Sequence, residues 1–184
     1  MGLATTAMQR LCQILDGFTE ITGKAIAWLT ALLILNTCAV VVLRYFLGTG
    51  SIILQESTTY IHASLFMLAM AFTLKRGGHV RVDVFYGRFS PRTQALVDVA
   101  GTLLFLIPVC LLILTSSWDY VVSSWAIKET STEGGGIPFV YLLKTLLLVL
   151  PSMLILQGIS EVIKNTLYFF GLGGSHTEEH LENI

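Results

Sequence analysis

The chain has 184 residues, of which 54% are hydrophobic and 12% are charged, and its formal net charge is −1. Soluble domains contain about 25% charged residues, so the composition excludes a water-soluble globule. It also excludes a disordered chain, which would be poor in apolar residues. There is no basic excess for nucleic-acid binding, and three cysteines without a C-x-x-C spacing indicate neither a disulfide framework nor a zinc site. The composition predicts a membrane protein.

Residues 1–24 precede the first apolar run and have hydrophobic residues at helical spacing. Met8, Leu11, Leu15 and Phe18 form the apolar stripe, and polar side chains occupy the other faces. This pattern predicts an amphipathic helix that lies in the cytoplasmic interface of the membrane. The alternatives are a frayed tail and a cytoplasmic continuation of the first span.

Four apolar runs follow, and each is about long enough to cross a hydrocarbon core of about 30 Å. They cover residues 25–43, 57–74, 99–118 and 139–160. Long continuous runs are typical of helices, whereas membrane barrels show short alternating segments. We therefore expect an all-α polytopic membrane protein with a four-helix membrane domain over residues 25–160 and a polar cytoplasmic tail over residues 161–184.

The Lys and Arg residues of the connections predict the orientation. Eight of them lie in the two terminal tails and the second connection, whereas only Arg44 and Lys128 lie in the first and third connections. Positive charge is retained on the cytoplasmic side. Both termini are therefore expected in the cytoplasm, in a bacterial-type inner membrane.

The spans contain few groups that could perform chemistry. His62 is the one histidine within a span, and a bis-histidine haem needs two. Lys144 lies about one turn inside the outer boundary, where its ammonium can reach the interface. No catalytic set can be assembled from residues at one depth. The sequence predicts no enzyme, no catalytic or metal-binding residues and no cofactor in this chain.

Isolated polar residues within the spans are candidates for helix packing or for contact with a partner subunit, because lipid cannot satisfy their hydrogen bonds. These residues are Asn36, Thr58, His62 and Gln157.

Two charged residues, Arg44 and Glu56, bracket the first external connection. Since the helices that they end and begin are antiparallel neighbours, we expect an ion pair or a partner contact at the outer face. The alternative is two separate interface anchors. Trp118 and Trp125, seven residues apart on one helical face, are expected in the aromatic belt, with Lys144 as a further interface anchor.

The second connection is the most charged segment. Lys75 and Arg76 precede two glycines, and His79, Arg81 and Asp83 then alternate with valines. Basic residues at this depth commonly contact lipid headgroups, but Asp83 is not explained in this way, so a structural or partner contact is the alternative. Further on, Ser90-Pro91 predicts a helix cap and first turn.

Several short segments together form a recognisable pattern. They are Arg44-Tyr-Phe46, Gln55-Glu56, the Lys-Arg-Gly-Gly-His-Val-Arg-Val-Asp sequence within residues 73–86, Ser117-Trp-Asp-Tyr-Val121, Gly135-Gly-Ile-Pro138 and Leu156-Gln-Gly158. On these segments the chain resembles the small membrane subunit, or Q subunit, of tripartite ATP-independent periplasmic (TRAP) transporters, from the first span to about Asn165. Many such subunits have Trp and two acids before the second span, where this chain has Leu54, Gln55 and Glu56. This departure is similar to the branch often labelled mannitol/chloroaromatic.

The resemblance implies four membrane helices with cytoplasmic termini and an association with a large membrane subunit. That subunit is expected to hold the substrate and Na⁺ sites and to move by an elevator mechanism, while a periplasmic substrate-binding protein delivers an organic acid. The small subunit would brace the static part of the large one against membrane lipids. The alternatives are a membrane anchor for another complex and an independent small carrier coupled through His62 or Lys144.

Overall fold

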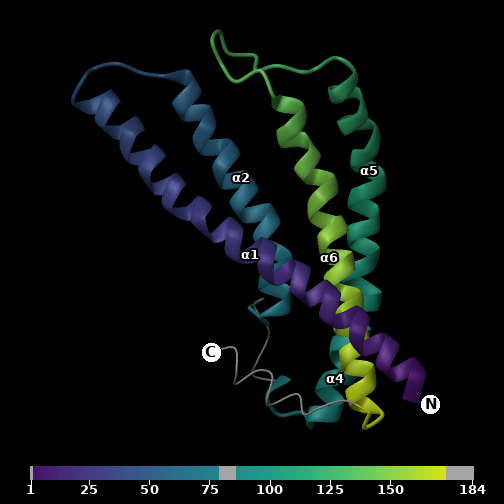
Figure 1. The fold of residues 1–184 in the computed structure, drawn as a ribbon. Coiled ribbons are helices and arrows are strands. Elements are labelled where there is room, and N and C mark those ends of the chain that lie inside the picture. The colour runs from purple at the N-terminus through teal and green to yellow at the C-terminus, as the bar shows by residue number, and fades with distance from the viewer. Residues whose placement is uncertain (1, 79–85, 173–184) are drawn as a thin grey trace.

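The computed structural model describes residues 2–78 and 86–172, and these residues form helices joined by short connections. In chain order the elements are α1 (Gly2–Tyr45), α2 (Ile52–Lys75), α4 (Pro91–Gly101), the π-helical turn η1 (Thr102–Leu106), α5 (Ile107–Ala126) and α6 (Val140–Phe169), as Figure 1 shows. Four helical segments of the described residues are long and apolar enough to cross a membrane: α1, α2, the rod of α4, η1 and α5, and α6. The predicted all-α polytopic class is confirmed.

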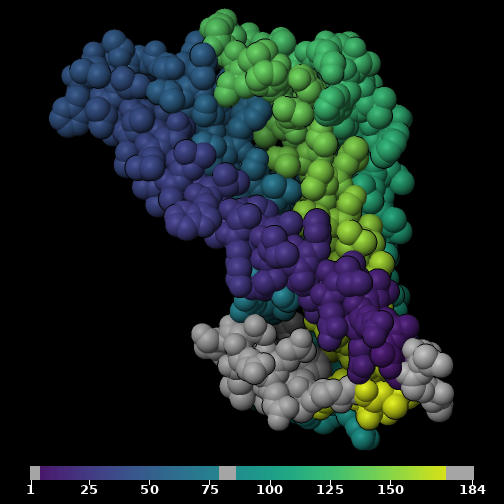
Figure 2. All heavy atoms as spheres, viewed as in Figure 1, coloured from purple at the N-terminus to yellow at the C-terminus, as the bar shows by residue number. Residues whose placement is uncertain are grey.

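The helices form two pairs that meet at one end of the bundle. α5 runs beside α6, whereas α1 crosses obliquely over α2 and then over α6 (Figure 1). The first turn of α1 and the last turn of α6 lie together at what we call the N-terminal end. The connections 46–51 and 127–139 lie at the opposite, far end, where α1 and α2 lean away from α5 and α6. Figure 2 shows the α1 side chains lying across α6 at the N-terminal end.

The predicted amphipathic segment is helical, but the structure joins it to the first span in one unbroken helix. This agrees with the alternative of a continuation of that span. Of the apolar stripe, Leu11 and Phe18 are exposed, whereas Met8 and Leu15 are half-buried. The buried positions of the segment include Cys12 and Thr19. The segment therefore turns a mixed face toward the other helices, and the polar members of that face meet polar side chains of α6.

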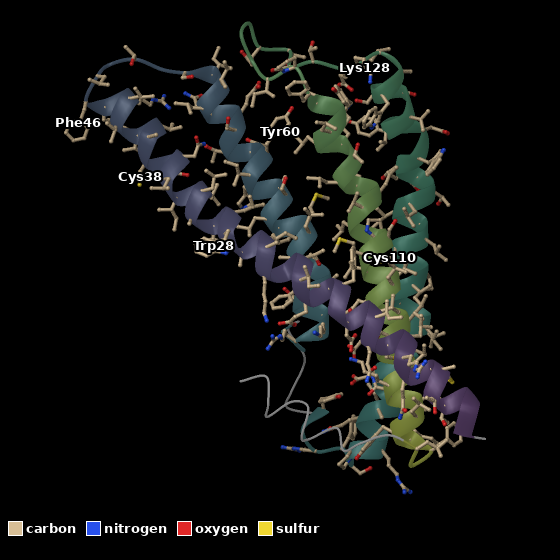
Figure 3. All side chains as sticks on the ribbon, in the orientation of Figure 1. Trp28, Cys38, Phe46, Tyr60, Cys110 and Lys128 are labelled. Carbon is tan, nitrogen blue, oxygen red and sulfur yellow. The ribbon has the colours of Figure 1, made fainter. Side chains whose placement is uncertain are left out.

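The crossing of α1 over α2 depends on a glycine. A Cβ atom at Gly23 would lie 2.3 Å from Cδ2 and 2.7 Å from Cβ of Phe72. Real Cβ atoms do not approach other carbons so closely, so only glycine fits here without a shift of Phe72. By contrast, Trp28 projects away from the neighbouring helices (Figure 3) and is 78% exposed, which is typical of a side chain in contact with lipid.

The third helical rod begins as predicted and contains a π-helical turn just before a proline. The Ser90 hydroxyl accepts a hydrogen bond from the Thr93 N–H, and Pro91 opens the helix. The π-helical turn precedes Pro108, whose ring removes a backbone donor and crowds the carbonyl four residues before it. A Cβ atom at Gly158 would lie 3.1 Å from Leu106 in this turn, so α6 packs closely against it. α6 itself continues to Phe169, past the expected boundary at residue 160.

Candidate functional site: polar contacts between the helices

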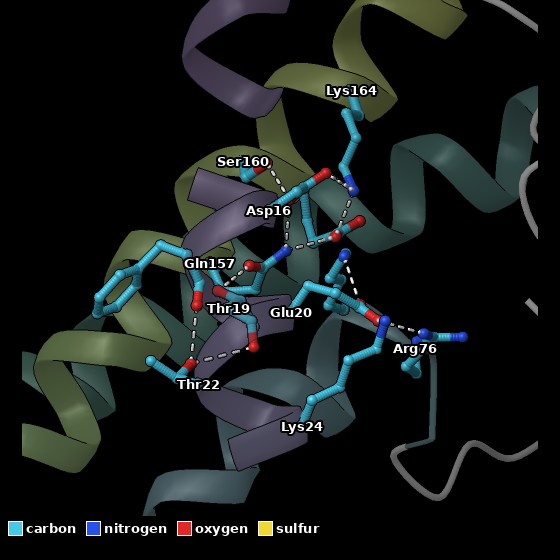
Figure 4. A network of polar contacts seen from close by, with 12 residues as sticks. Asp16, Thr19, Glu20, Thr22, Lys24, Arg76, Gln157, Ser160 and Lys164 are labelled. Atoms are coloured by element: carbon cyan, nitrogen blue, oxygen red, sulfur yellow. Dashed lines mark hydrogen bonds and ion pairs between the residues drawn. The ribbon is translucent and has the colours of Figure 1, made fainter. Parts of the chain in front are cut away.

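Polar side chains from three helices meet at the N-terminal end of the bundle, and we call this group the three-helix polar cluster (Figure 4). Its members come from α1, from the end of α2 and from the second half of α6. They are Asp16, Thr19, Glu20, Lys75, Arg76, Gln157, Ser160, Glu161 and Lys164. The α6 residues share one face, since they are spaced by three and four residues along the helix.

Gln157 lies at the centre of the cluster and is completely buried. Its Oε1 accepts a hydrogen bond of 2.7 Å from the Thr19 hydroxyl, and its Nε2 donates to Asp16 and to Glu161, each at 3.0 Å. The side-chain amide therefore uses its acceptor and both donors. A buried amide satisfied in this way fixes the position of α1 on α6.

Asp16 and Lys164 extend this contact toward the end of α6. The Ser160 hydroxyl donates to Oδ1 of Asp16 at 2.8 Å, and the Lys164 ammonium lies 3.2 Å from Oδ2 of Asp16 and 2.7 Å from Glu161. Each charge in this part of the cluster has an opposite charge beside it. Pairing of this kind is what makes partly buried charges tolerable.

Glu20 connects α1 to the end of α2. Its carboxylate lies 2.7 Å from the Lys75 ammonium, 2.6 Å from the Arg76 guanidinium and 3.1 Å from Lys24 on its own helix. The two basic residues also suit the negative end of the α2 dipole. Sequence reasoning left a lipid, a structural and a partner contact open for Lys75 and Arg76, and the structure places both against α1. His79, Arg81 and Asp83 of the same predicted motif lie outside the described residues.

Asn36 joins α1 to α2 in the middle of the apolar region. Its Nδ2 donates to the Leu54 carbonyl and to the Thr58 hydroxyl, both at 2.9 Å. Asn36 and Thr58 thus make the kind of helix-to-helix contact that their positions suggested. His62 does not, because its side chain is exposed and its ring stacks on Phe66 of the same helix, with 6.4 Å between the centroids.

At the far end, the structure does not bring Arg44 and Glu56 together. The Glu56 carboxylate accepts hydrogen bonds from the Ser131 hydroxyl and, at 2.5 Å, from the Ile137 N–H. Arg44 is exposed at the end of α1, which leans outward there (Figure 1). Among the described residues the expected ion pair is therefore absent. Glu56 instead holds the 127–139 connection against α2, and Gly136 leaves room for it.

Lys144 has a partner that sequence reasoning missed. Its ammonium lies 2.5 Å from Glu129 of the preceding connection and 3.9 Å from the centroid of the Tyr120 ring. The Lys144 ammonium lowers the pKa of the Glu129 carboxyl below its usual 4.5. The available signal was the position of both residues beside the same external turn.

The two tryptophans of α5 have different surroundings. The Trp125 indole N–H donates to the Thr145 hydroxyl at 2.8 Å, and its ring contacts Tyr141 edge to face, with 4.7 Å between centroids. Lys128 lies over the Trp125 ring, 4.9 Å from its centroid. Trp118 is 57% exposed. Trp125 therefore stabilises the α5–α6 hairpin, while Trp118 is available for the aromatic belt that the sequence predicts.

This arrangement holds helices together, and comparison with known families adds a second finding. The family described as tripartite ATP-independent periplasmic transporters, DctQ component, matches residues 33–167. The chain belongs to this family. The resemblance inferred from sequence is confirmed, and the protein is a multi-pass membrane component of a TRAP transporter. No curated protein and no solved structure matches the chain.

The family match covers only part of the three-helix polar cluster. It includes Gln157 and its neighbours on α6 as well as the end of α2, but it begins after Asp16, Thr19 and Glu20. In the described residues of this DctQ component, no group of three His, Cys, Asp or Glu side chains is placed to bind a metal ion. The polar side chains that the structure brings together are those that join helices.

Proposed function

We propose that this DctQ component is a static scaffold for the large membrane subunit of its transporter. The observation that supports this role is the use of two side-chain amides within its helices, that of the half-buried Asn36 and that of the buried Gln157. Asn36 and Gln157 direct their hydrogen-bonding groups at neighbouring helices of the same chain. A carrier needs polar groups that are free to bind its substrate or coupling ion. A scaffold needs them to hold its own helices in place.

In this proposal the large membrane subunit binds Na⁺ and the solute, an organic acid delivered by a periplasmic substrate-binding protein. The small subunit requires no cofactor, and its outward apolar side chains contact lipids of the inner membrane. Both termini lie in the cytoplasm. In a cysteine-free chain, Arg88→Cys and Lys128→Cys, both at exposed positions, should then react with a membrane-impermeant maleimide from opposite sides. Reaction of both from the periplasmic side would refute the orientation.

Uptake in proteoliposomes tests the scaffold itself. A labelled organic acid that the transporter's binding protein recognises is offered, with an inward Na⁺ gradient, to vesicles containing this chain alone, the large subunit alone, or both. We expect uptake only when both membrane subunits and the binding protein are present. Accumulation by this chain alone would identify an independent carrier. Purification with a different partner, and not with the large subunit, would identify an anchor for another complex.

A further inference from the structure

One side of α2 faces away from every other helix of the chain. Gln55, Thr59, His62 and Phe66 are all exposed, and their spacing of four, three and four residues places them on one face. Thr58, on a different face, contacts Asn36 of α1. This outward face of α2, defined by those four residues, is covered by nothing in the part of the chain that the structure describes.

The outward face differs from a surface made for lipid. Exposed hydroxyls on other helices, such as Thr37 on α1 and Thr115 on α5, donate to carbonyls of their own helix. The side chains of Gln55, Thr59 and His62 have no hydrogen-bond partner among the described residues. The His62 ring lies parallel to Phe66, with 5° between the planes, so this contact involves the flat side of the imidazole. The edge that bears the two nitrogens remains without a partner there.

The depth of His62 makes its missing partner costly. It lies ten residues after Ile52, the first residue of α2, which corresponds to about 15 Å along the axis. This is about half the thickness of a hydrocarbon core of about 30 Å. At this depth neither water nor lipid tails can satisfy an imidazole. Ionisable side chains in such positions usually face protein.

We propose that the outward face of α2 binds a transmembrane helix of the large membrane subunit, and that a hydrogen-bonding group of that helix pairs with His62. This inference rests on the proposed function and specifies the surface through which the scaffold acts. Thr59 and Gln55 extend the same row toward the far end of the bundle. Phe66 continues it toward the N-terminal end with an apolar contact.

A second copy of this chain fits the face poorly. Two copies with the same orientation in a membrane would be related by an axis along the membrane normal, so each residue would meet itself. Close pairing of identical membrane helices relies on small residues, Gly, Ala, Ser or Thr, at the contact. Thr59 is the one such residue among the four of the face, and the large side chains of His62 and Phe66 would each meet their own copy. A different helix can place small residues opposite both.

Photocrosslinking in the assembled transporter tests the location. The photoreactive residue p-benzoylphenylalanine replaces Thr59 in the full chain, produced together with the large subunit and the binding protein. The matched control places it at Leu112, which is 64% exposed on α5. We expect a crosslink to the large subunit from position 59 and none from position 112.

Substitution of His62 tests the hydrogen bond. His62→Leu should reduce the amount of large subunit retained during purification by about 3-fold to 20-fold, the effect of losing one hydrogen bond between membrane helices. His62→Gln, which keeps a donor and an acceptor, should restore part of it. Leu112→Ala should retain the wild-type amount. The isolated His62→Leu chain should keep its thermal stability, since the imidazole contacts no other helix.

The remaining outcomes overturn the inference in different ways. A crosslink from position 59 to a second copy of this chain would show that the face mediates self-association and does not bind the large subunit. A crosslink to the large subunit from position 112 alone, or wild-type retention by His62→Leu, would place the contact elsewhere while leaving the scaffold function intact. Failure of the wild-type chain to purify with the large subunit would refute the proposed function itself.

Discussion

Two alanine substitutions in the same helix should change stability in opposite directions. Gly17 and Gly23 both lie in α1 before the apolar region. A Cβ atom at Gly17 would meet no atom within 4 Å, whereas one at Gly23 would lie 2.3, 2.4 and 2.7 Å from three carbons of Phe72. Gly17→Ala should therefore stabilise the helix, and Gly23→Ala should disrupt the contact between α1 and α2.

The expected magnitudes follow from the space at each site. Replacing glycine by alanine inside a helix stabilises it by about 0.5–1 kcal/mol, and this gain is common to both variants. Overpacking costs about 1–3 kcal/mol. The cost of overpacking at Gly23 should lie toward the upper end, because the atoms concerned include Cβ of Phe72, which cannot move unless the backbone of α2 moves. The two variants should differ by about 2–3 kcal/mol.

Reversible unfolding of the purified chain in mixed micelles, titrated with a denaturing detergent, measures this difference. The double variant Gly23→Ala, Phe72→Ala supplies the control, since removal of the ring eliminates the two shortest contacts, at 2.3 and 2.4 Å, and leaves only the contact with Cβ at 2.7 Å. It should be more stable than the sum of the two single effects predicts. Equal stability of Gly17→Ala and Gly23→Ala would show that α1 does not cross α2 at this glycine.

Three further predictions use the same unfolding assay or its thermal equivalent. Gln157→Ala removes three hydrogen bonds, each contributing about 0.6–1.7 kcal/mol in a membrane protein, so it should destabilise the chain by about 2–5 kcal/mol. Ser152→Ala, whose hydroxyl bonds only within α6, should have little effect, and equal effects would contradict the role of Gln157. Asn36→Leu removes two such bonds and should cost about 1–3 kcal/mol; unchanged stability would count against the α1–α2 contact. Because Lys144 lowers the pKa of Glu129, the ionised carboxylate stabilises the fold above its unfolded-state pKa of about 4.5, and this is lost as the pH falls through the lower folded-state value. Glu129→Gln should therefore lower Tm at neutral pH, and its difference from the wild type should shrink as the pH falls below 4.5. A difference that does not shrink in acid would exclude the pair.

The helices were predictable because the membrane leaves little choice. Within hydrocarbon every backbone group must find a partner inside its own segment, so a long apolar run becomes a helix. The start of α4 was equally predictable, because the capping hydroxyl of Ser90 and the proline that opens the helix are adjacent in the sequence. The extension of α6 to Phe169 was missed because Glu161 and Lys164 resemble a polar tail. In the structure these charges face Asp16 and Gln157.

The partners within the candidate site were less predictable than its members. An amide such as Gln157 in an apolar run must contact something polar, and the sequence identified it for that reason. Its partner Thr19 is 138 positions away, and only the crossing of α1 over α6 brings them together. The amphipathic pattern of residues 1–24 was interpreted with water on the polar side, whereas that side meets protein. Glu56 was assigned to Arg44, its neighbour in sequence, and bonds to Ile137 instead.

Polar residues that face the other helices of this chain and polar residues that face outward should give different effects when they are substituted. Gln157 and Asn36 hold the helices of this chain to one another, so their loss should weaken the isolated subunit and, through it, the transporter. His62 is exposed, and its ring stacks on Phe66 of its own helix, so its loss should leave the isolated subunit as stable as the wild type and weaken only its association with the large subunit. Measuring unfolding and retention on the same variants would distinguish these cases. If His62→Leu also destabilised the isolated chain, the imidazole would have an internal role, and the outward face of α2 would no longer be required as a binding surface.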